Sequence, residues 1–426
     1  MMLIGLIDKY RSYLKSSFYY LLASFMSAII GVVIFPFQSQ YMNHEDFAIV
    51  GYFTSFSQLL GPIVNFSLIS YYSRNYFQIK DTERDGVLNV VLWGLNLWGI
   101  ISTVLLCVSF YFFLEYSNTN FTFWPYAVIA LLPYYFNNFY TIYQVKCRME
   151  RQAKKFFYFT TVHTILVPIF TVLFVIIFRM GAEGKLIALL MPTLIMGIYA
   201  FKRLYNTELP KWNKSILSKA FHFGWPLSLS TMLWYFAGGV DRYFLASVND
   251  TYNLGLYNIG LQISGYMAIF ITVLMQTFEP DIYKAIADNN QKRIWKLGLL
   301  IVASNAIINM LFILICPYVI DLLTYHKFTA SAEFTQIATL KNVSISLYFV
   351  INTIIIGYGY TKSSLMIRAI SAIICYFMYK LLIENYGFYG AAYGQVLSFV
   401  IMTLVAIVFL FFLSYKKKKV QCSNMK

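Results

Sequence analysis

Long apolar stretches fill this chain of 426 residues, and short polar connections separate them. A helix needs about 20 residues to cross a hydrocarbon core, and each stretch has close to that length or more. The pattern therefore predicts an all-α integral membrane protein with about twelve transmembrane helices. They are expected at residues 17–37, 46–71, 87–114, 122–145, 156–178, 184–201, 220–240, 254–278, 295–319, 333–357, 363–383 and 388–414.

Cationic residues alternate along the connections between these spans. On the predicted topology, 27 of the 33 Lys and Arg residues fall on one side, five on the other, and Lys341 inside a span. Cytoplasmic loops carry the excess of Lys and Arg in membrane proteins. Both termini are therefore expected in the cytoplasm, as an even number of helices requires.

The composition narrows the class of protein further. The chain is 59% hydrophobic and 12% charged, and its net charge of +15 comes from cations beside membrane spans, so no nucleic-acid partner is expected. No P-loop pattern GxxxxGK[ST] is present, and the five cysteines and four histidines are scattered. We expect neither an enzyme nor a metal or cofactor.

The most hydrophilic connection follows the sixth span and predicts a division into two halves. The N-terminal six-helix bundle is expected at 1–204, the cytoplasmic linker at 205–219, and the C-terminal bundle with its basic tail at 220–426. Because six is even, both halves enter the membrane from the same side. Two parallel-repeat bundles around a central cavity are a common transporter design.

Polar side chains recur every three or four residues along four of the spans, which places them on one helix face. Small and polar residues also hold helices together in lipid, so helix packing stays open as an alternative to a hydrated cavity. The residues predicted to bind substrate are Gln58 and Asn65 in the second span, Tyr235 and Arg242 at the seventh, Asn258 and Gln262 in the eighth, and Lys341 and Tyr348 in the tenth.

Lys341 is the cation that the pattern places inside the membrane, about 12 Å of helix rise from the non-cytoplasmic end. An ammonium group there costs at least about 2.5 kcal/mol unless it faces water or an anion. Snorkelling or pairing with Glu333 is the alternative explanation. For Arg242, the alternative to substrate contact is mutual pairing with Asp241 or outward solvation of both.

Three short segments of the second half carry a family resemblance. Residues 223–227 (FGWPL), 241–245 (DRYFL) and 255–259 (GLYNI) follow in an order that resembles the polysaccharide-type flippases. Within the multidrug/oligosaccharidyl-lipid/polysaccharide exporter superfamily, the chain is most similar to bacterial O-antigen flippases. Residues 43–47 (NHEDF) are similar to the family's acidic pair, although Ala48 and Val50 replace its Gly and Tyr.

The resemblance implies a cavity formed by helices 1, 2, 7 and 8 of two six-helix bundles. It implies a flippase of O-antigen and lipopolysaccharide biosynthesis, multi-pass in the bacterial cell inner membrane. The substrate would be an undecaprenyl-diphosphate-linked oligosaccharide, moved from the cytoplasmic to the periplasmic leaflet by alternating access. Membrane lipids and other polysaccharide-assembly membrane proteins are the further partners that it implies.

One departure from the superfamily affects the expected site. Lipid II flippases use arginines within helices 1 and 2 against the diphosphate, whereas the corresponding spans here contain no cation. Lys341, with Lys15 and Arg74 at the cytoplasmic mouth, is expected to take that role.

Two other functions are kept as alternatives. A cation-coupled drug or small-molecule antiporter of the same superfamily usually needs a buried acidic residue, and no predicted span has one near its middle. A surface-glycan polymerase would be expected to have a long periplasmic loop with arginines.

Overall fold

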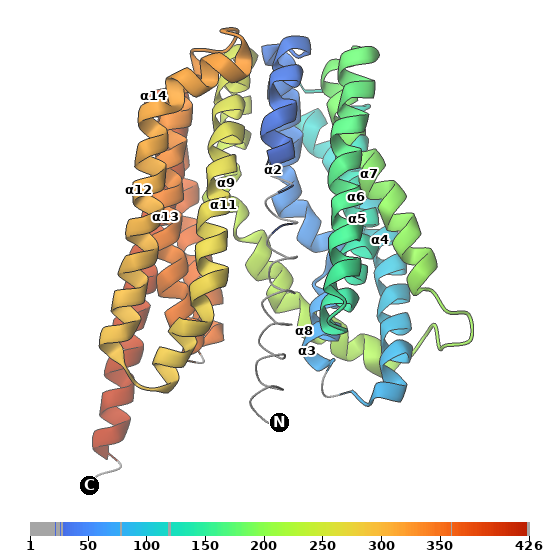
Figure 1. Ribbon diagram of the computed structural model, residues 1–426, viewed down its shortest axis with the longest axis vertical. Coiled ribbons are helices and arrows are strands. Elements are labelled where there is room, and N and C mark those ends of the chain that lie inside the picture. Colours follow the sequence, from blue (N-terminus) through green and yellow to red (C-terminus); the bar gives the residue numbers. More distant parts are fainter. Residues whose placement is uncertain are drawn as a thin grey trace, which may run out of the picture. The chain divides into compact units, whose positions relative to one another are not determined.

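The computed structural model describes residues 22, 26, 29–76, 79–117, 121–358 and 360–423, and these residues form helices without any strand (Figure 1). The predicted all-α membrane class is confirmed. After a short helix at Ile29–Tyr41 the elements are α2 (His44–Asn65), α3 (Leu68–Asn75), η1 (Asp81–Glu83), α4 (Arg84–Tyr116), α5 (Tyr126–Met149), α6 (Ala153–Thr171), the π-helical η2 (Val172–Ile177), α7 (Gly181–Leu204), α8 (Lys214–Met232), α9 (Tyr235–Gly238), α10 (Val240–Ala246), α11 (Thr251–Ala287), α12 (Gln291–Thr324), α13 (Ser331–Gly357) and α14 (Thr361–Ser423).

The chain divides into two compact units, Met1–Met232 and Leu233–Lys426. In the first unit α5 packs against α2, α4 and α7, and α6 packs against α7. Helix α8 follows the 205–219 connection and packs against α2, α3 and α4. The bundle boundaries proposed from the sequence, 1–204 and 220–426, stay a prediction.

The second unit is built on α13, which packs against α11, α12 and α14. Helix α14 changes direction at Gly387, whose φ of 55° and ψ of −129° are readily adopted by glycine. The Cys375 thiol lies 3.9 Å from the Ser398 carbonyl oxygen, and the Tyr379 ring occupies the space beside Gly394. The two parts of α14 therefore lie side by side, as the separate spans 363–383 and 388–414 predict.

The second and seventh predicted spans are wrong as continuous helices. The stretch 46–71 breaks at Phe66 and Ser67, which have φ values of 44° and 51°. The stretch 220–240 breaks after Met232 and again at Gly239, so that α8, α9 and α10 follow one another. Hydropathy records only how apolar a stretch is, so it does not reveal a break whose backbone groups find other partners.

Asp46, in the acidic pair before the second predicted span, caps two helices of the first unit. The Asn43 side chain accepts from the Asp46 N–H at 2.8 Å, and the Asp46 carboxylate accepts from the Asn43 N–H at 2.9 Å. The same carboxylate accepts from the Ala182 N–H at 2.7 Å, at the start of α7. Asp46 therefore satisfies helix-end donors on α2 and α7 and links these helices.

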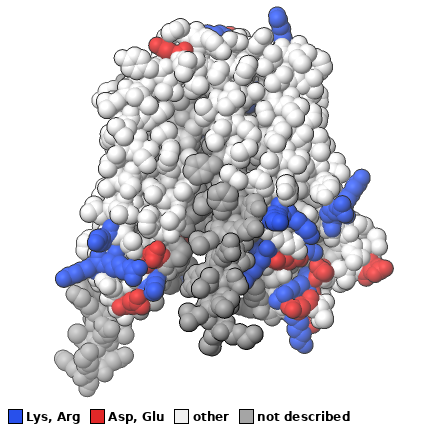
Figure 2. Space-filling model, viewed as in Figure 1, with Lys and Arg blue, Asp and Glu red and all other residues white. Residues whose placement is uncertain are grey.

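Seven helices among the described residues are long and apolar enough to cross a membrane, or eight if His44–Phe56 and Leu59–Asn65 form one bent span. Residues 362–412 count once in that number despite the turn at Gly387, so the number twelve stays a prediction. Leu299 and Leu314 on α12 are more than 70% exposed, as expected for lipid-facing side chains. On the face shown in Figure 2, charged side chains lie mainly near helix ends.

Candidate functional site

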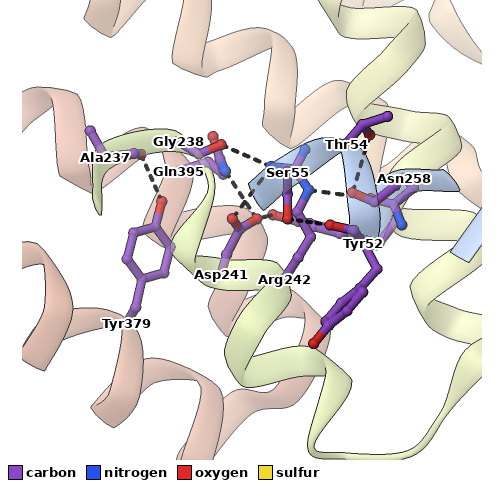
Figure 3. A network of polar contacts seen from close by, with 12 residues as sticks. Tyr52, Thr54, Ser55, Ala237, Gly238, Asp241, Arg242, Asn258, Tyr379 and Gln395 are labelled. Carbon is purple, nitrogen blue, oxygen red and sulfur yellow. Dashed lines mark hydrogen bonds and ion pairs between the residues drawn. The ribbon is translucent and has the colours of Figure 1, made fainter. Parts of the chain in front are cut away.

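The break in the seventh span, within the second unit, is held by hydrogen bonds (Figure 3). The Ala237 carbonyl accepts from the Tyr379 hydroxyl at 3.0 Å and from the Ser398 hydroxyl at 2.8 Å. The Gly238 carbonyl accepts from Arg242 Nη1 at 2.8 Å. These donors replace the helical hydrogen bonds that the break removes, so the backbone remains satisfied.

Asp241 lies at this break with no exposed surface. Its Oδ2 accepts hydrogen bonds from the Tyr257 hydroxyl and from Gln395 Nε2, the latter at 2.9 Å, and its Oδ1 lies 3.6 Å from Arg242 Nη1. The predicted pairing of Asp241 with Arg242 is confirmed. Outward solvation is wrong for Asp241, because α10 continues the chain to Ala246 and buries the carboxylate.

Arg242 connects α10 to α11, since its Nε donates to Asn258 Oδ1 at 3.3 Å. The structure thus brings together two residues that the sequence predicted for the site. Gln262, one turn further along α11, donates to the Tyr266 hydroxyl at 3.3 Å. Tyr235 is buried on α9. The breaks around α9 mean that the spacing of polar residues in the seventh span does not define one continuous helix face.

Lys341 is partly buried on α13 and forms no ion pair with any carboxylate in the described part of the chain. The predicted alternative, pairing with Glu333, is wrong because Glu333 accepts a hydrogen bond from the Tyr389 hydroxyl instead. Lys341 thus has no carboxylate partner in the described part of the chain, whereas Arg242 pairs with Asp241.

Arg368 on α14 is a further partly buried cation of the second unit, which the sequence did not predict for the site. Its guanidinium carbon lies 5.4 Å from the centroid of the Trp234 ring, and its Nε donates to the Tyr348 hydroxyl at 3.3 Å. Tyr348 is fully buried and packs against Trp234, with ring centroids 5.8 Å apart. The available signal was that Arg368 falls inside the predicted span 363–383.

The remaining predicted residues belong to the first unit. The Asn65 side chain accepts from the backbone N–H two residues further on, at 2.8 Å, and so supports the break between α2 and α3. Arg74 on α3 lies 4.8 Å from the centroid of an aromatic ring on α8. Gln58 is on α2, and its side chain lies outside what the structure describes, as does the whole of Lys15.

The second unit thus contains three partly buried cations, Arg242, Lys341 and Arg368, of which Arg242 pairs with Asp241. Arginine forks bind phosphate oxygens with two parallel hydrogen bonds, and partly desolvated cations attract anions more strongly than exposed ones. In transporters, discontinuous helices commonly form binding sites. The arrangement suits an anionic ligand, and no group of metal-ligating side chains occurs among the described residues.

Solved structures of membrane transporters share this fold. The lipid II flippase MurJ in an inward closed conformation matches with a TM-score of 0.69 at 15% identity, covering 91% of this chain and 86% of that chain. An inward-facing multidrug resistance MATE family transporter of the MOP superfamily matches with a TM-score of 0.67 at 14% identity, covering 91% and 95%. At these identities the similarity defines the fold.

The chain belongs to the family described as polysaccharide biosynthesis protein, whose pattern matches residues 13–285. Lsg locus putative protein 1 of Haemophilus influenzae is 22% identical over 278 residues, covering 64% of this chain and 66% of that protein. An uncharacterized membrane protein of Methanocaldococcus jannaschii is 20% identical over 254 residues, covering 55% and 59%. The matches span less than two thirds of these relatives. The family match thus confirms the predicted link to polysaccharide biosynthesis, and the solved structures confirm the predicted transporter fold.

Proposed function

We propose that the protein is a flippase for undecaprenyl-diphosphate-linked oligosaccharide repeat units of O-antigen or a similar surface polysaccharide. It moves them by alternating access from the cytoplasmic to the periplasmic leaflet of the bacterial inner membrane, with both of its own termini in the cytoplasm. The observation that carries the proposal is that Arg242, Lys341 and Arg368 are all partly buried in the second unit, with Arg242 at the broken helix beside Asp241. Family and fold support it.

The chemistry of the site suits a lipid-linked sugar diphosphate. Arg242 and Lys341 supply positive charge against the diphosphate. An inside-negative potential favours outward movement of the negative charges, by about 2.3 kcal/mol per charge per 100 mV if the full field is crossed. No covalent step is required, so the protein needs no catalytic group.

The buried carboxylate of Asp241 favours a second candidate, a cation-coupled antiporter of the same superfamily. The sequence argument against such coupling was that no predicted span has an acidic residue near its middle. Asp241 lies just beyond the predicted span 220–240, but its carboxylate is buried. However, Tyr257 and Gln395 already donate to this carboxylate, and Arg242 faces it. Its charge is therefore largely compensated without a further cation.

The deciding experiment locates the lipid-linked repeat unit in a strain that lacks this gene and has lost its surface glycan. Spheroplasts are treated with a membrane-impermeant sugar-labelling probe before and after lysis. Labelling only after lysis is expected, because translocation is then the missing step. Single units labelled before lysis would instead point to a missing polymerase, and the absence of accumulated units would favour the antiporter.

A further inference from the structure

A cavity of about 780 Å³ lies in the first unit among α5, α6 and α7. Its polar and charged lining residues lie at the helix ends that the charge pattern places in the cytoplasm, where α5 ends and α6 begins. Lys155 on α6 and Arg203 on α7 line it, and both side chains are exposed. Neither forms an ion pair with a carboxylate in the described part of the chain.

The lining changes from charged to apolar along the helices. On α6 it runs from Lys155 through Phe159 to Val162, a distance of about 10 Å at 1.5 Å of rise per residue. On α7, which runs in the opposite direction, it goes from Arg203 to Ile195. Charged groups therefore gather at one end of the cavity and apolar groups at the other, which is the polarity of an amphiphilic molecule.

The acidic side chain of the lining does not cancel these cations. Glu150 lies 3.7 Å from Lys146 and accepts from Gln152 Nε2 at 2.8 Å, while Lys146 also bonds Asp85 at 2.9 Å. This carboxylate is therefore already engaged by its own neighbours. The charge left to attract a ligand is that of Lys155 and Arg203.

The apolar end of the cavity faces outward rather than into the unit. Val162 and Ile195 are 47% and 40% exposed, on helices long and apolar enough to cross a membrane. A hydrocarbon chain placed there would cover the exposed part of these side chains. Basic pockets between transmembrane helices on the cytoplasmic side commonly bind anionic lipid headgroups.

We propose that this cavity binds one anionic phospholipid of the cytoplasmic leaflet. Its phosphate lies between Lys155 and Arg203, and the upper part of its acyl chains lies along Val162 and Ile195. The Tyr199 hydroxyl, which accepts from Arg203 Nε at 3.3 Å, holds the guanidinium at the mouth. The site lies on helices that the proposed transport site does not use.

Native mass spectrometry of the purified full-length protein tests this site. Phosphatidylglycerol and phosphatidylcholine with identical acyl chains are titrated separately, and phosphatidylglycerol is expected to bind at least tenfold more tightly. The double variant K155Q/R203Q should weaken phosphatidylglycerol binding about 25-fold, since each basic residue near the headgroups contributes about fivefold. Phosphatidylcholine, whose choline cation offsets the charge of its phosphate, should lose much less affinity, and its retained binding also shows that the variant is folded.

The matched control is K154Q/K202Q, which removes the neighbouring exposed cations of the same two helices. These side chains do not line the cavity, so the loss should stay below twofold. Equal losses in both double variants would mean diffuse attraction to surface charge, and the proposed site would be wrong. Displacement of phosphatidylglycerol by glycerophosphate at similar concentration would show a site for a soluble anion, which also overturns the proposal.

Discussion

Among single residues, Lys341 contributes the clearest uncompensated positive charge, because its ammonium group has no carboxylate partner in the described structure. In the variant Lys341→Ala we expect glycan export to fall about 10- to 100-fold, since a hydrogen bond to a charged group contributes about 1.5–3 kcal/mol. Export is measured as surface glycan per folded protein in the membrane.

Two variants separate charge from packing in that experiment. Lys341→Arg keeps the positive charge and should restore much of the export. Lys380→Ala removes a half-exposed cation of the same unit whose nearest carboxylate is Glu384 at 4.0 Å, and should leave export unchanged. If Lys341→Ala exported normally, Lys341 would not belong to the substrate path.

Gly224, in the FGWPL segment, shows a different kind of constraint on a single position. A Cβ atom there would lie 2.2 Å from the Phe66 carbonyl oxygen, at the break between α2 and α3. Because this obstacle is backbone, Gly224→Ala should destabilise the protein by about 1–3 kcal/mol. Thermal unfolding in detergent measures the loss.

Gly265 provides the control for this substitution, since nothing lies within 4 Å of a Cβ atom built there. It sits inside α11, where alanine is favoured over glycine by about 0.5–1 kcal/mol, so Gly265→Ala should leave stability unchanged or raise it. Equal behaviour of the two variants would contradict the packing explanation for Gly224.

The sequence predicted some site residues because their chemistry is unusual in a membrane, and missed others because their chemistry is ordinary there. Lys341 and Arg242 are cations in or beside apolar spans, which is costly without a partner. Tyr257 and Gln395, which bind Asp241, are polar residues of a kind that helix packing in lipid also uses. Only the fold brings α11 and α14 next to α10, and so shows that Tyr257 and Gln395 bind Asp241.

Among the helices, the broken seventh span depends on the carbonyl of Ala237, which has two donors from different parts of α14. Loss of either donor alone leaves the carbonyl satisfied, so Tyr379→Phe and Ser398→Ala should each cost about 0.5–1.5 kcal/mol. The double variant leaves a buried carbonyl without a side-chain donor. Its cost should exceed the sum of the single costs by about 1 kcal/mol.

A double-mutant cycle by thermal unfolding measures this coupling. Ser346→Ala serves as a matched control, because its hydroxyl bonds only its own helix, at the Val343 carbonyl at 2.6 Å. Combined with Tyr379→Phe, it should show additive costs. If the costs of Tyr379→Phe and Ser398→Ala were strictly additive, the two hydroxyls would not act together on the Ala237 carbonyl.

Helix positions were largely predictable, since the apolar stretches correspond to α4, α5, α7, α11, α12 and α13 within a few residues at most ends. The breaks at Phe66–Ser67 and near Gly239 were not predictable from hydropathy. Partners far away in the sequence hold them: Ser228 donates to the Pro62 carbonyl at 3.0 Å, and Ser398 donates to that of Ala237. Such contacts exist only once the fold has formed.

For the molecule as a whole, the proposed direction of transport depends on orientation, which the positive-inside rule assigns through the connections between helices. The connection between α7 and α8 contains Lys211 and should face the cytoplasm, whereas the one between α12 and α13 should face the periplasm. The single-cysteine variants Thr207→Cys and Thr329→Cys, in a chain whose native cysteines are replaced, test this with a membrane-impermeant maleimide on intact spheroplasts.

We expect the cysteine that replaces Thr329 to be labelled in intact spheroplasts and the one that replaces Thr207 only after lysis. Both positions lie in exposed connections, so a difference in labelling reports the side of the membrane and not burial. The opposite pattern would invert the molecule. The predicted cytoplasmic location of both termini would then be wrong.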